Sequence, residues 1–302
     1  MIMLEMITIK EAAEEAGGNQ QIFEEMFNKF RQWLQQQLHL PQEITDRRLQ
    51  CTLLCSKFDL EKAKKRLDSL YTLHNLIPEF FSDYDPLSDS IARFHKSTNW
   101  VPLPKLTPQK YRVNIGGWRS EDSSMFNLQD VVKYLFMITD VRAEEDTVNN
   151  ELIIWDCKHL TLGHMLKYTP STLKKCDLCL EAYGFRFKAI YMINAPSFIG
   201  RLLSVLKMTL KAKLFNRIHV SESGIESLYE AIPKSILPMD YGGDEPSMKI
   251  LTDMWYEKLM ERRNWLLEQE KLKTNESLRT NSVIDPDDLF GVAGTFRTLE
   301  ID

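Results

Sequence analysis

The sequence has few of the residues on which small secreted or fibrous proteins depend. Only five of its 302 residues are cysteine, and their irregular spacing argues against a disulfide framework and fits a reducing compartment. Glycine and proline, 12 of each, are too scarce for a collagen-like or low-complexity chain. No stretch reaches the roughly 18 uninterrupted apolar residues of a membrane-spanning helix. Met1–Met6 lacks a basic signal-peptide start and contains Glu5, so we expect a cytoplasmic protein.

The motifs of common enzyme and cofactor sites are missing as well. The chain has no G-x-S-x-G turn, no P-loop and no G-x-G-x-x-G turn, which leaves hydrolase, nucleotidase and dinucleotide-binding functions without their usual support. Cys176 and Cys179 form a C-x-x-C pair, but zinc needs two more ligands at suitable spacing, and the pair falls inside a predicted helix. Asp156 ends a predicted strand, where local capping is commoner than catalysis. We therefore predict no enzyme, no metal and no cofactor.

The distribution of charge is more informative than its total. The net charge of -5 disfavours a general nucleic-acid binder, which is normally basic. No acidic residue lies between Glu181 and Glu222, although the rest of the chain carries 31 basic against 43 acidic residues. That stretch contains seven basic residues: Arg186, Lys188, Arg201, Lys207, Lys211, Lys213 and Arg217. Because ordinary solvated surfaces mix both signs, this segment indicates an anionic partner.

An amphipathic helix is predicted inside this basic stretch. At helical spacing, one broad face carries the apolar residues Phe198, Ile199, Leu202, Leu203, Leu206 and Leu210. Arg201, Lys207 and Lys211 lie opposite, and Lys213 would fall on the apolar face, so the helix should end before it. Such a helix is typical of a membrane surface, where each cation near an anionic leaflet contributes roughly 1 kcal/mol. A core-packing helix with a solvated outer face is the alternative.

The sequence pattern predicts that the first hundred residues are mainly helical. Apolar residues recur at helical spacing over 22–34, which predicts a first helix. Thr45 is placed to cap a second helix that continues through Leu54. A longer helix is predicted to follow Asp59 and to end near Pro78. Prolines 102, 104 and 108 then predict an extended linker, because proline cannot continue a helix.

After the linker, short apolar runs alternate with helical patterns. The predicted strands are 111–115, 151–156, 188–194 and 217–220, and the predicted helices are 128–140, 172–183 and 248–273. This alternation implies an α/β fold with a mostly parallel sheet. We divide the chain into a helical N-terminal domain over 1–100, an α/β domain over 101–245, and a C-terminal helix and tail over 246–302. The tail after Asn275 is polar, and we expect it to be partly mobile.

Several segments, in order along the chain, resemble the CRAL-TRIO (Sec14-like) lipid-binding family. The segments in the α/β region are Phe185–Pro196 (FRFKAIYMINAP), Lys213–His219 (KLFNRIH) and Ile232–Gly243 (IPKSILPMDYGG). Trp33–Pro41 and Lys57–Ala63 resemble its helical N-terminal domain. Tyr71–Phe81 and Asp288–Gly291 are similar to an arthropod branch close to alpha-tocopherol transfer and retinaldehyde-binding proteins.

The resemblance implies a carrier of one hydrophobic lipid, such as tocopherol or a retinoid, that exchanges its ligand at phosphoinositide-containing membranes. It implies a lid helix over a hydrophobic pocket and reversible association of a cytoplasmic protein with the membrane. A phosphoinositide-dependent scaffold or lipid sensor without net transfer is the alternative. By position in the family, the expected pocket residues are Tyr134, Met137, Ile138, Val141, Trp155, Leu160, Cys179, Tyr183, Phe185, Ile190, Ile199, Leu202, Val205, Leu206 and Leu210. The expected phosphoinositide-binding residues are Arg186, Lys188, Lys213 and Arg217.

The chain departs from the family pattern at several positions that bear on function. Thr52–Asp59 lacks the arginines that many relatives carry before this Phe-Asp pair, so no family cation is expected from the helical region. Met137 and Val141 stand about where tocopherol carriers have serine, which predicts a drier pocket and a less polar ligand. We expect an enclosed apolar cavity beneath residues 198–210.

Overall fold

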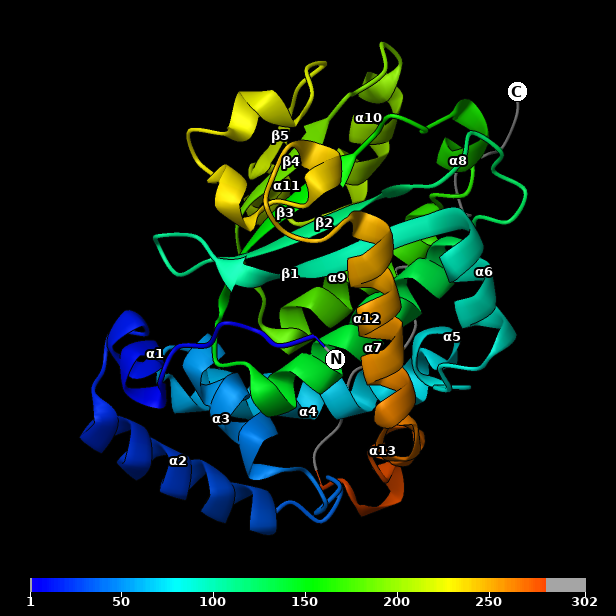
Figure 1. Cartoon of the computed structure of the whole chain (residues 1–302). Helices are drawn as coiled ribbons and strands as arrows, with labels where there is room; N and C mark the ends of the chain where they lie inside the picture. Colours follow the sequence, from blue (N-terminus) through cyan, green and yellow to red (C-terminus); the bar gives the residue numbers. More distant parts are fainter. Residues whose placement is uncertain (1, 281–302) are drawn as a thin grey trace, which may run out of the picture.

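The computed structural model describes residues 2–280, and the chain begins with six helices (Figure 1, blue to cyan). They are α1 (Ile9–Glu15), α2 (Gln20–Gln35), α3 (Asp46–Cys55), α4 (Leu60–Leu76), α5 (Pro78–Phe81) and α6 (Asp89–Ser97). The side chains of Asn19, Thr45 and Asp59 accept backbone N–H groups at the starts of α2, α3 and α4. Such local capping fixes where a helix starts, and the starts predicted at Thr45 and Asp59 are confirmed.

Five strands form one sheet in the order β1–β2–β3–β4–β5. They are β1 (Thr98–Leu106), β2 (Arg112–Trp118), β3 (Asn150–Asp156), β4 (Arg186–Ile193) and β5 (Ile218–Val220). The β1–β2 pair is antiparallel and the other three pairs are parallel. The predicted α/β class, with a helical N-terminal region and a mostly parallel sheet, is confirmed.

The extended linker predicted around Pro102 and Pro104 is wrong, because this segment is strand β1. An edge strand tolerates proline, since one of its edges has no neighbouring strand to bond. Pairing with β2 is interrupted between Pro102 and Leu106. The carbonyl of Pro102 accepts the indole N–H of Trp255 at 2.9 Å instead. The sequence pattern could not reveal that the prolines would lie at an edge.

Helices cross between the parallel strands and continue past them. The α/β region contains α7 (Leu128–Glu145), α8 (Leu162–Met165), α9 (Pro170–Tyr183), α10 (Ile199–Thr209) and α11 (Ala212–Phe215). Three 3-10 turns follow at Ile225–Leu228, Lys234–Ile236 and Met239–Tyr241. The amphipathic helix predicted before Lys213 is confirmed as α10, which ends before Leu210.

The single C-terminal helix predicted over 248–273 is wrong, because the structure has two helices there. Helix α12 (Met248–Glu261) ends at Arg262, α13 (Arg263–Gln269) starts at the next residue, and a 3-10 turn follows at Glu276–Leu278. Arg262 lies 2.9 Å from Glu145, and Arg263 lies 2.6 Å from Asp85, so two ion pairs hold the chain at the break. Figure 1 shows α12 running from the sheet towards the N-terminal helices. The predicted polar tail from residue 281 onward, including Asp288–Gly291, lies outside the described residues.

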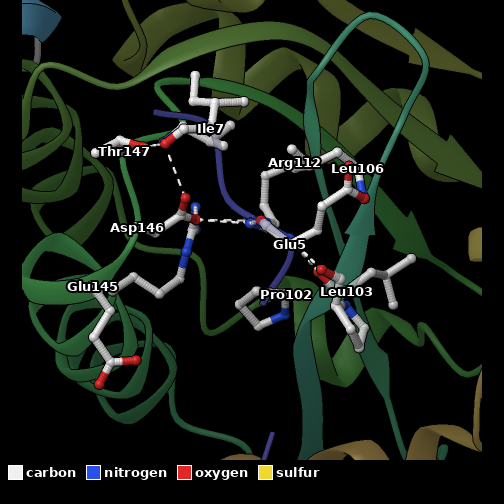
Figure 2. Close-up of polar contacts among 12 residues, drawn as sticks. Glu5, Ile7, Pro102, Leu103, Leu106, Arg112, Glu145, Asp146 and Thr147 are labelled. Carbon is white, nitrogen blue, oxygen red and sulfur yellow. Dashed lines mark hydrogen bonds and ion pairs between the residues drawn. The ribbon is translucent and has the colours of Figure 1, made fainter. Parts of the chain in front are cut away.

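The segment before α1 lies against the sheet through the fully buried Arg112 (Figure 2). The Arg112 guanidinium donates to the carbonyl oxygens of Glu5 and Leu103 and pairs with Asp146 at 3.1 Å. The Thr147 hydroxyl donates to the Ile7 carbonyl. These contacts join the N-terminal segment to β1, β2 and the end of α7, and so place α1 near the candidate site described next.

Candidate functional site

A cavity of about 600 Å³ lies where the N-terminal helices meet the α/β region. The corner between α3 and α4, the C-terminal end of α9, the start of β4 and α11 form its walls. The four residues predicted to bind phosphoinositide, Arg186, Lys188, Lys213 and Arg217, all border it. A volume of this size is typical of a small-molecule site.

The cavity wall is strongly basic. Eight cationic residues border it: Lys57, Lys62, Arg66, Arg186, Lys188, Lys211, Lys213 and Arg217. Three carboxylates, from Glu15, Asp177 and Glu181, border it as well. Among residues 2–280, Lys211 alone of these eight cations lies within 4.0 Å of a carboxylate oxygen. The described residues therefore leave an excess of positive charge in the cavity wall, which suits an anionic ligand.

Two of the guanidinium groups are held by the C-terminal end of α3. Arg66 donates to the Cys55 carbonyl at 2.8 Å and to the Ser56 hydroxyl at 3.1 Å. Arg186 donates to the carbonyls of Leu54 and Cys55. The last carbonyls of a helix carry partial negative charge and attract cations, which explains how two arginines can lie so close. Burial, followed by the neighbouring Arg186, lowers the pKa of Arg66.

The connection between α10 and α11 is tied to α9 at the cavity edge. Lys211 forms an ion pair with Glu181, and its backbone N–H donates to the Asp177 carboxylate at 3.3 Å. Burial raises the pKa of Asp177. Both partners of the Lys211–Glu181 pair are about half exposed, so water screens the attraction and the pair contributes little stability. A competing anion could therefore displace Glu181 at small cost.

The predicted apolar pocket residues gather in the main hydrophobic core. Fourteen of the fifteen belong to it or pack against it, and Leu210 does not. On α7 and α9, Tyr134, Met137 and Cys179 are fully buried. Among the four cavities described for residues 2–280, only Tyr183 and Phe185 of the predicted set border any, and no residue of α10 does. The enclosed cavity expected beneath residues 198–210 is thus not among them, because these side chains pack against one another.

Helix α10 covers this apolar region loosely. Leu202 is its one buried residue, whereas Ile199, Val205 and Leu206 are only half-buried. The N-terminus of α10 has no side-chain cap, and Met208 is 76% exposed. The helix packs chiefly on α9 and α11. A helix with so few buried apolar contacts opens at lower cost than its neighbours.

The residues considered for catalysis or metal binding have structural partners. The Asp156 carboxylate accepts the Asn194 amide at 2.8 Å, the Tyr241 hydroxyl at 3.1 Å and a backbone N–H. Cys176 and Cys179 lie on α9, as predicted, where burial raises the pKa of both thiols. No group of His, Cys, Asp and Glu residues suited to a metal ion occurs in the described part of the chain. Likewise, none of its helices is long and apolar enough to cross a bilayer.

Three basic wall residues were not identified from the sequence. Lys57, Lys62 and Arg66 lie in the helical region, where the family pattern predicts no cation for this sequence. Lys57 lies in the connection between α3 and α4, and Lys62 and Arg66 reach the cavity because α4 packs against α9. Nothing in the local pattern of α4 distinguishes these cations from Lys64 and Lys65, which lie outside the wall.

Two family models match the chain. Residues 96–243 match the model described as "CRAL/TRIO domain", and residues 19–91 match "Pinta-like, UBA domain". The first includes the sheet, α10 and the predicted phosphoinositide-binding residues, and the second includes the α3–α4 corner.

Curated proteins with related sequences include human "Alpha-tocopherol transfer protein-like", 26% identical over 196 residues that cover 63% of this chain and 56% of that protein. Human "Clavesin-2" is 30% identical over 128 residues, covering 41% of this chain and 39% of that protein. The chain thus matches about half the length of these relatives or less. Among solved structures, "Crystal structure of Sfh5" covers 85% of this chain and 100% of its own, at 12% identity and a TM-score of 0.41.

Proposed function

This chain belongs to the CRAL-TRIO family, and from that premise we propose that it carries one hydrophobic lipid and exchanges it at anionic membranes. The lipid would be tocopherol, a retinoid or a molecule of similar size and polarity. The observation that carries the proposal is the convergence of Arg186, Lys188, Lys213 and Arg217 on one basic cavity beside the end of α10. The surface that contacts the membrane would then lie beside α10, the helix that covers the apolar region.

The apolar region under α10 supplies the walls for such a lipid. Burying apolar surface contributes roughly 25 cal/mol per Å², so several hundred Å² of ligand gives on the order of 10 kcal/mol before association costs. Because the side chains there pack against one another, entry of a lipid requires α10 to move away from α9 and the sheet. The half-buried Ile199, Val205 and Leu206 make α10 the element best suited to that movement.

The contacts of Lys211 suggest how membrane binding would promote opening. Glu181 and Asp177 hold the α10–α11 connection on α9. An anionic headgroup in the cavity competes with Glu181 for Lys211, which removes the side-chain part of this attachment. Glu181→Gln should therefore increase binding to anionic vesicles several-fold, because it removes a repelling charge, with little change in melting temperature.

The direct test is transfer of a fluorescent tocopherol between donor vesicles and phosphoinositide-containing acceptor vesicles. We compare the unaltered chain with Lys213→Glu/Arg217→Glu, and use Lys10→Glu/Lys65→Glu, two exposed cations outside the cavity, as the charge-matched control. The cavity variant should lose at least ten-fold in vesicle binding and transfer rate, while the control changes by less than three-fold. Equal losses in both variants would contradict a specific role for the cavity.

A second function, a phosphoinositide-dependent scaffold or lipid sensor, is distinguished by the same experiment. A scaffold binds anionic vesicles through the cavity but moves no lipid between them. The complete burial of Tyr134 and Met137 in the hydrophobic core favours this alternative. Vesicle binding without transfer of tocopherol or retinoid would support the scaffold and reject the carrier.

A further inference from the structure

Helix α3 carries two free thiols, Cys51 and Cys55, one turn apart on the same face. Side chains four residues apart are neighbours on a helix surface. Cys55 is buried and its sulfur lies 3.2 Å from the side-chain oxygen of Asn149, whereas Cys51 keeps part of its surface exposed. A partly accessible thiol therefore has a second, protected thiol beside it.

Both cysteines border a small cavity of about 40 Å³ that is distinct from the basic cavity. The two cavities are neighbours, because Cys55 and Phe185 border each of them. A water molecule needs about 10–15 Å³ of such space, so the small cavity has room for a molecule of a few heavy atoms. A lipid headgroup is too large for it.

The wall of the small cavity offers hydrogen-bonding groups to such a molecule. Arg142 and Asn149 border it and are 6% and 5% exposed. The Arg142 Nε and Asn149 Nδ2 donors have no hydrogen-bond partner among residues 2–280. The Thr139 hydroxyl, also in the wall, donates to the Leu135 carbonyl and keeps its lone pairs as acceptors. A small ligand with oxygen acceptors and an O–H donor would satisfy these groups.

The surroundings of the two thiols give them different chemistry. The pKa of Cys51 is lowered by a hydrogen bond from Cys55 and by the nearby guanidinium groups of Arg48 and Arg142, against the opposing effects of burial and Asp146. The same hydrogen bond and burial raise the pKa of Cys55. Because the thiolate is the nucleophile, Cys51 is the thiol suited to attack first, and Cys55 is placed to react second.

We propose that Cys51 and Cys55 are a peroxide-reactive pair, in which Cys51 is oxidised by hydrogen peroxide held in the small cavity and Cys55 resolves the product as a disulfide. The Cys51 thiolate attacks one peroxide oxygen, so that an S–O bond forms, the O–O bond breaks, and hydroxide leaves and takes up the proton that Cys51 released. The Cys55 sulfur then attacks the sulfenic acid sulfur, so that the S–S bond forms and the S–O bond breaks. The departing hydroxide takes the Cys55 proton. Two thiols are oxidised by two electrons and one peroxide is reduced to two waters.

The disulfide requires the last turn of α3 to unwind. The Cβ atoms of residues four apart on a helix are about 5–6 Å apart, whereas a disulfide needs about 3.5–4.5 Å. Helix α3 ends at Cys55, so only its final turn has to change. The residues that follow, Lys57 and Phe58, have φ values of 57° and 62°, which residues with side chains seldom adopt. Unwinding would let both leave this strained conformation.

The same turn holds two cations of the basic cavity. The carbonyls of Leu54 and Cys55 accept hydrogen bonds from Arg186, and the Cys55 carbonyl accepts another from Arg66. Unwinding displaces these acceptors, so oxidation should weaken anion binding in the basic cavity. The thiol reaction itself does not rest on the proposed function, and only its effect on membrane binding does.

The chain contains its own control for the thiol reaction. Cys176 is also partly exposed and has Cys179 one turn away on α9, but burial raises the pKa of both. Neither borders any of the four cavities described for residues 2–280. The reduced full chain is treated with hydrogen peroxide at pH 7, and each cysteine is followed by peptide mass spectrometry. Cys51 and Cys55 fall on one tryptic peptide, 49–57, so their disulfide appears as the loss of two hydrogens.

We expect the 49–57 peptide to oxidise at least ten-fold faster than Cys176 and to recover fully with dithiothreitol. In Cys55→Ser, which keeps a hydrogen-bond donor for Asn149, dimedone should trap sulfenic acid at Cys51. Cys176→Ser should behave like the unaltered chain. Equal rates at Cys51 and Cys176, or the absence of a disulfide in 49–57, would overturn the proposal, and the rate comparison needs no variant to fold.

The effect on the basic cavity is measured with phosphatidylcholine vesicles that contain phosphatidylinositol bisphosphate. Oxidation should weaken binding of the unaltered chain at least three-fold, reversibly, and should leave Cys51→Ser unchanged. A disulfide that forms without altering vesicle binding would overturn the link to the cavity. If the reduced chain binds no vesicles, the proposed function fails while the peptide measurement still decides the thiol reaction.

Discussion

Asp140 gives the sharpest test of how the helical region is joined to the α/β region. Its carboxylate, 3% exposed on α7, forms an ion pair with the buried Arg48 of α3. The hydroxyls of Tyr84 and Tyr183 donate to the same carboxylate at 2.8 and 3.0 Å. Three separate elements therefore depend on one negative charge, and Asp140→Asn removes that charge while nearly preserving the shape of the side chain.

The loss of stability expected for Asp140→Asn follows from the charge of Arg48, which the substitution leaves without a partner. Arg48 would stay buried without a counter-charge, and breaking a buried ion pair in this way costs about 3–5 kcal/mol. Arg48→Met/Asp140→Asn removes both charges, so it should be less destabilised than Asp140→Asn alone. We would measure unfolding in urea by tryptophan fluorescence and circular dichroism. A loss below about 1 kcal/mol for Asp140→Asn, or a double variant at least as unstable as Asp140→Asn, would refute this reasoning.

Two further predictions concern a glycine and a histidine. Gly243→Ala should lower the free energy of unfolding by at least about 2 kcal/mol, because the new Cβ would lie 2.0 Å from the Leu237 carbonyl oxygen. Gly200→Ala on α10, with open space around it, should be neutral or stabilising. A melting temperature of Gly243→Ala equal to or above that of Gly200→Ala would contradict this description of the packing. Burial lowers the pKa of His74 to about 4 from 6.5, so the unfolded chain binds the extra proton and stability should fall by about 2 kcal/mol from pH 7 to pH 5. In His74→Phe this pH-dependent loss should shrink, and an unchanged loss would assign it to other groups.

Features fixed by local chemistry could be predicted from the sequence, and features fixed by neighbours could not. Thr45 and Asp59 start helices because their side chains accept N–H groups three residues ahead. The prolines of β1 were misassigned because their tolerance depends on an unpaired edge. The break at Arg262 depends on carboxylates that come from elsewhere in the chain, such as Glu145.

The same distinction applies to the candidate site. Arg186, Lys188, Lys213 and Arg217 belong to one stretch without acidic residues, so composition alone drew attention to them. Arg66 belongs to a helix of mixed charge and reaches the cavity because α4 packs on α9. The apolar pocket residues were identifiable as buried, but their packing against one another depends on the position of α10.

Charge is used in two different ways in this chain. Arg48, Arg112 and Arg142 are buried against carboxylates, so their cost of burial is offset within the fold and they join its regions. Seven of the eight cavity cations form no ion pair within residues 2–280, and two of them, Arg66 and Arg186, are held by backbone carbonyls. An anion bound in the cavity would relieve their mutual repulsion. The arrangement thus destabilises the free protein slightly while it favours the anion-bound one, and added polyphosphate should raise the melting temperature of the whole chain.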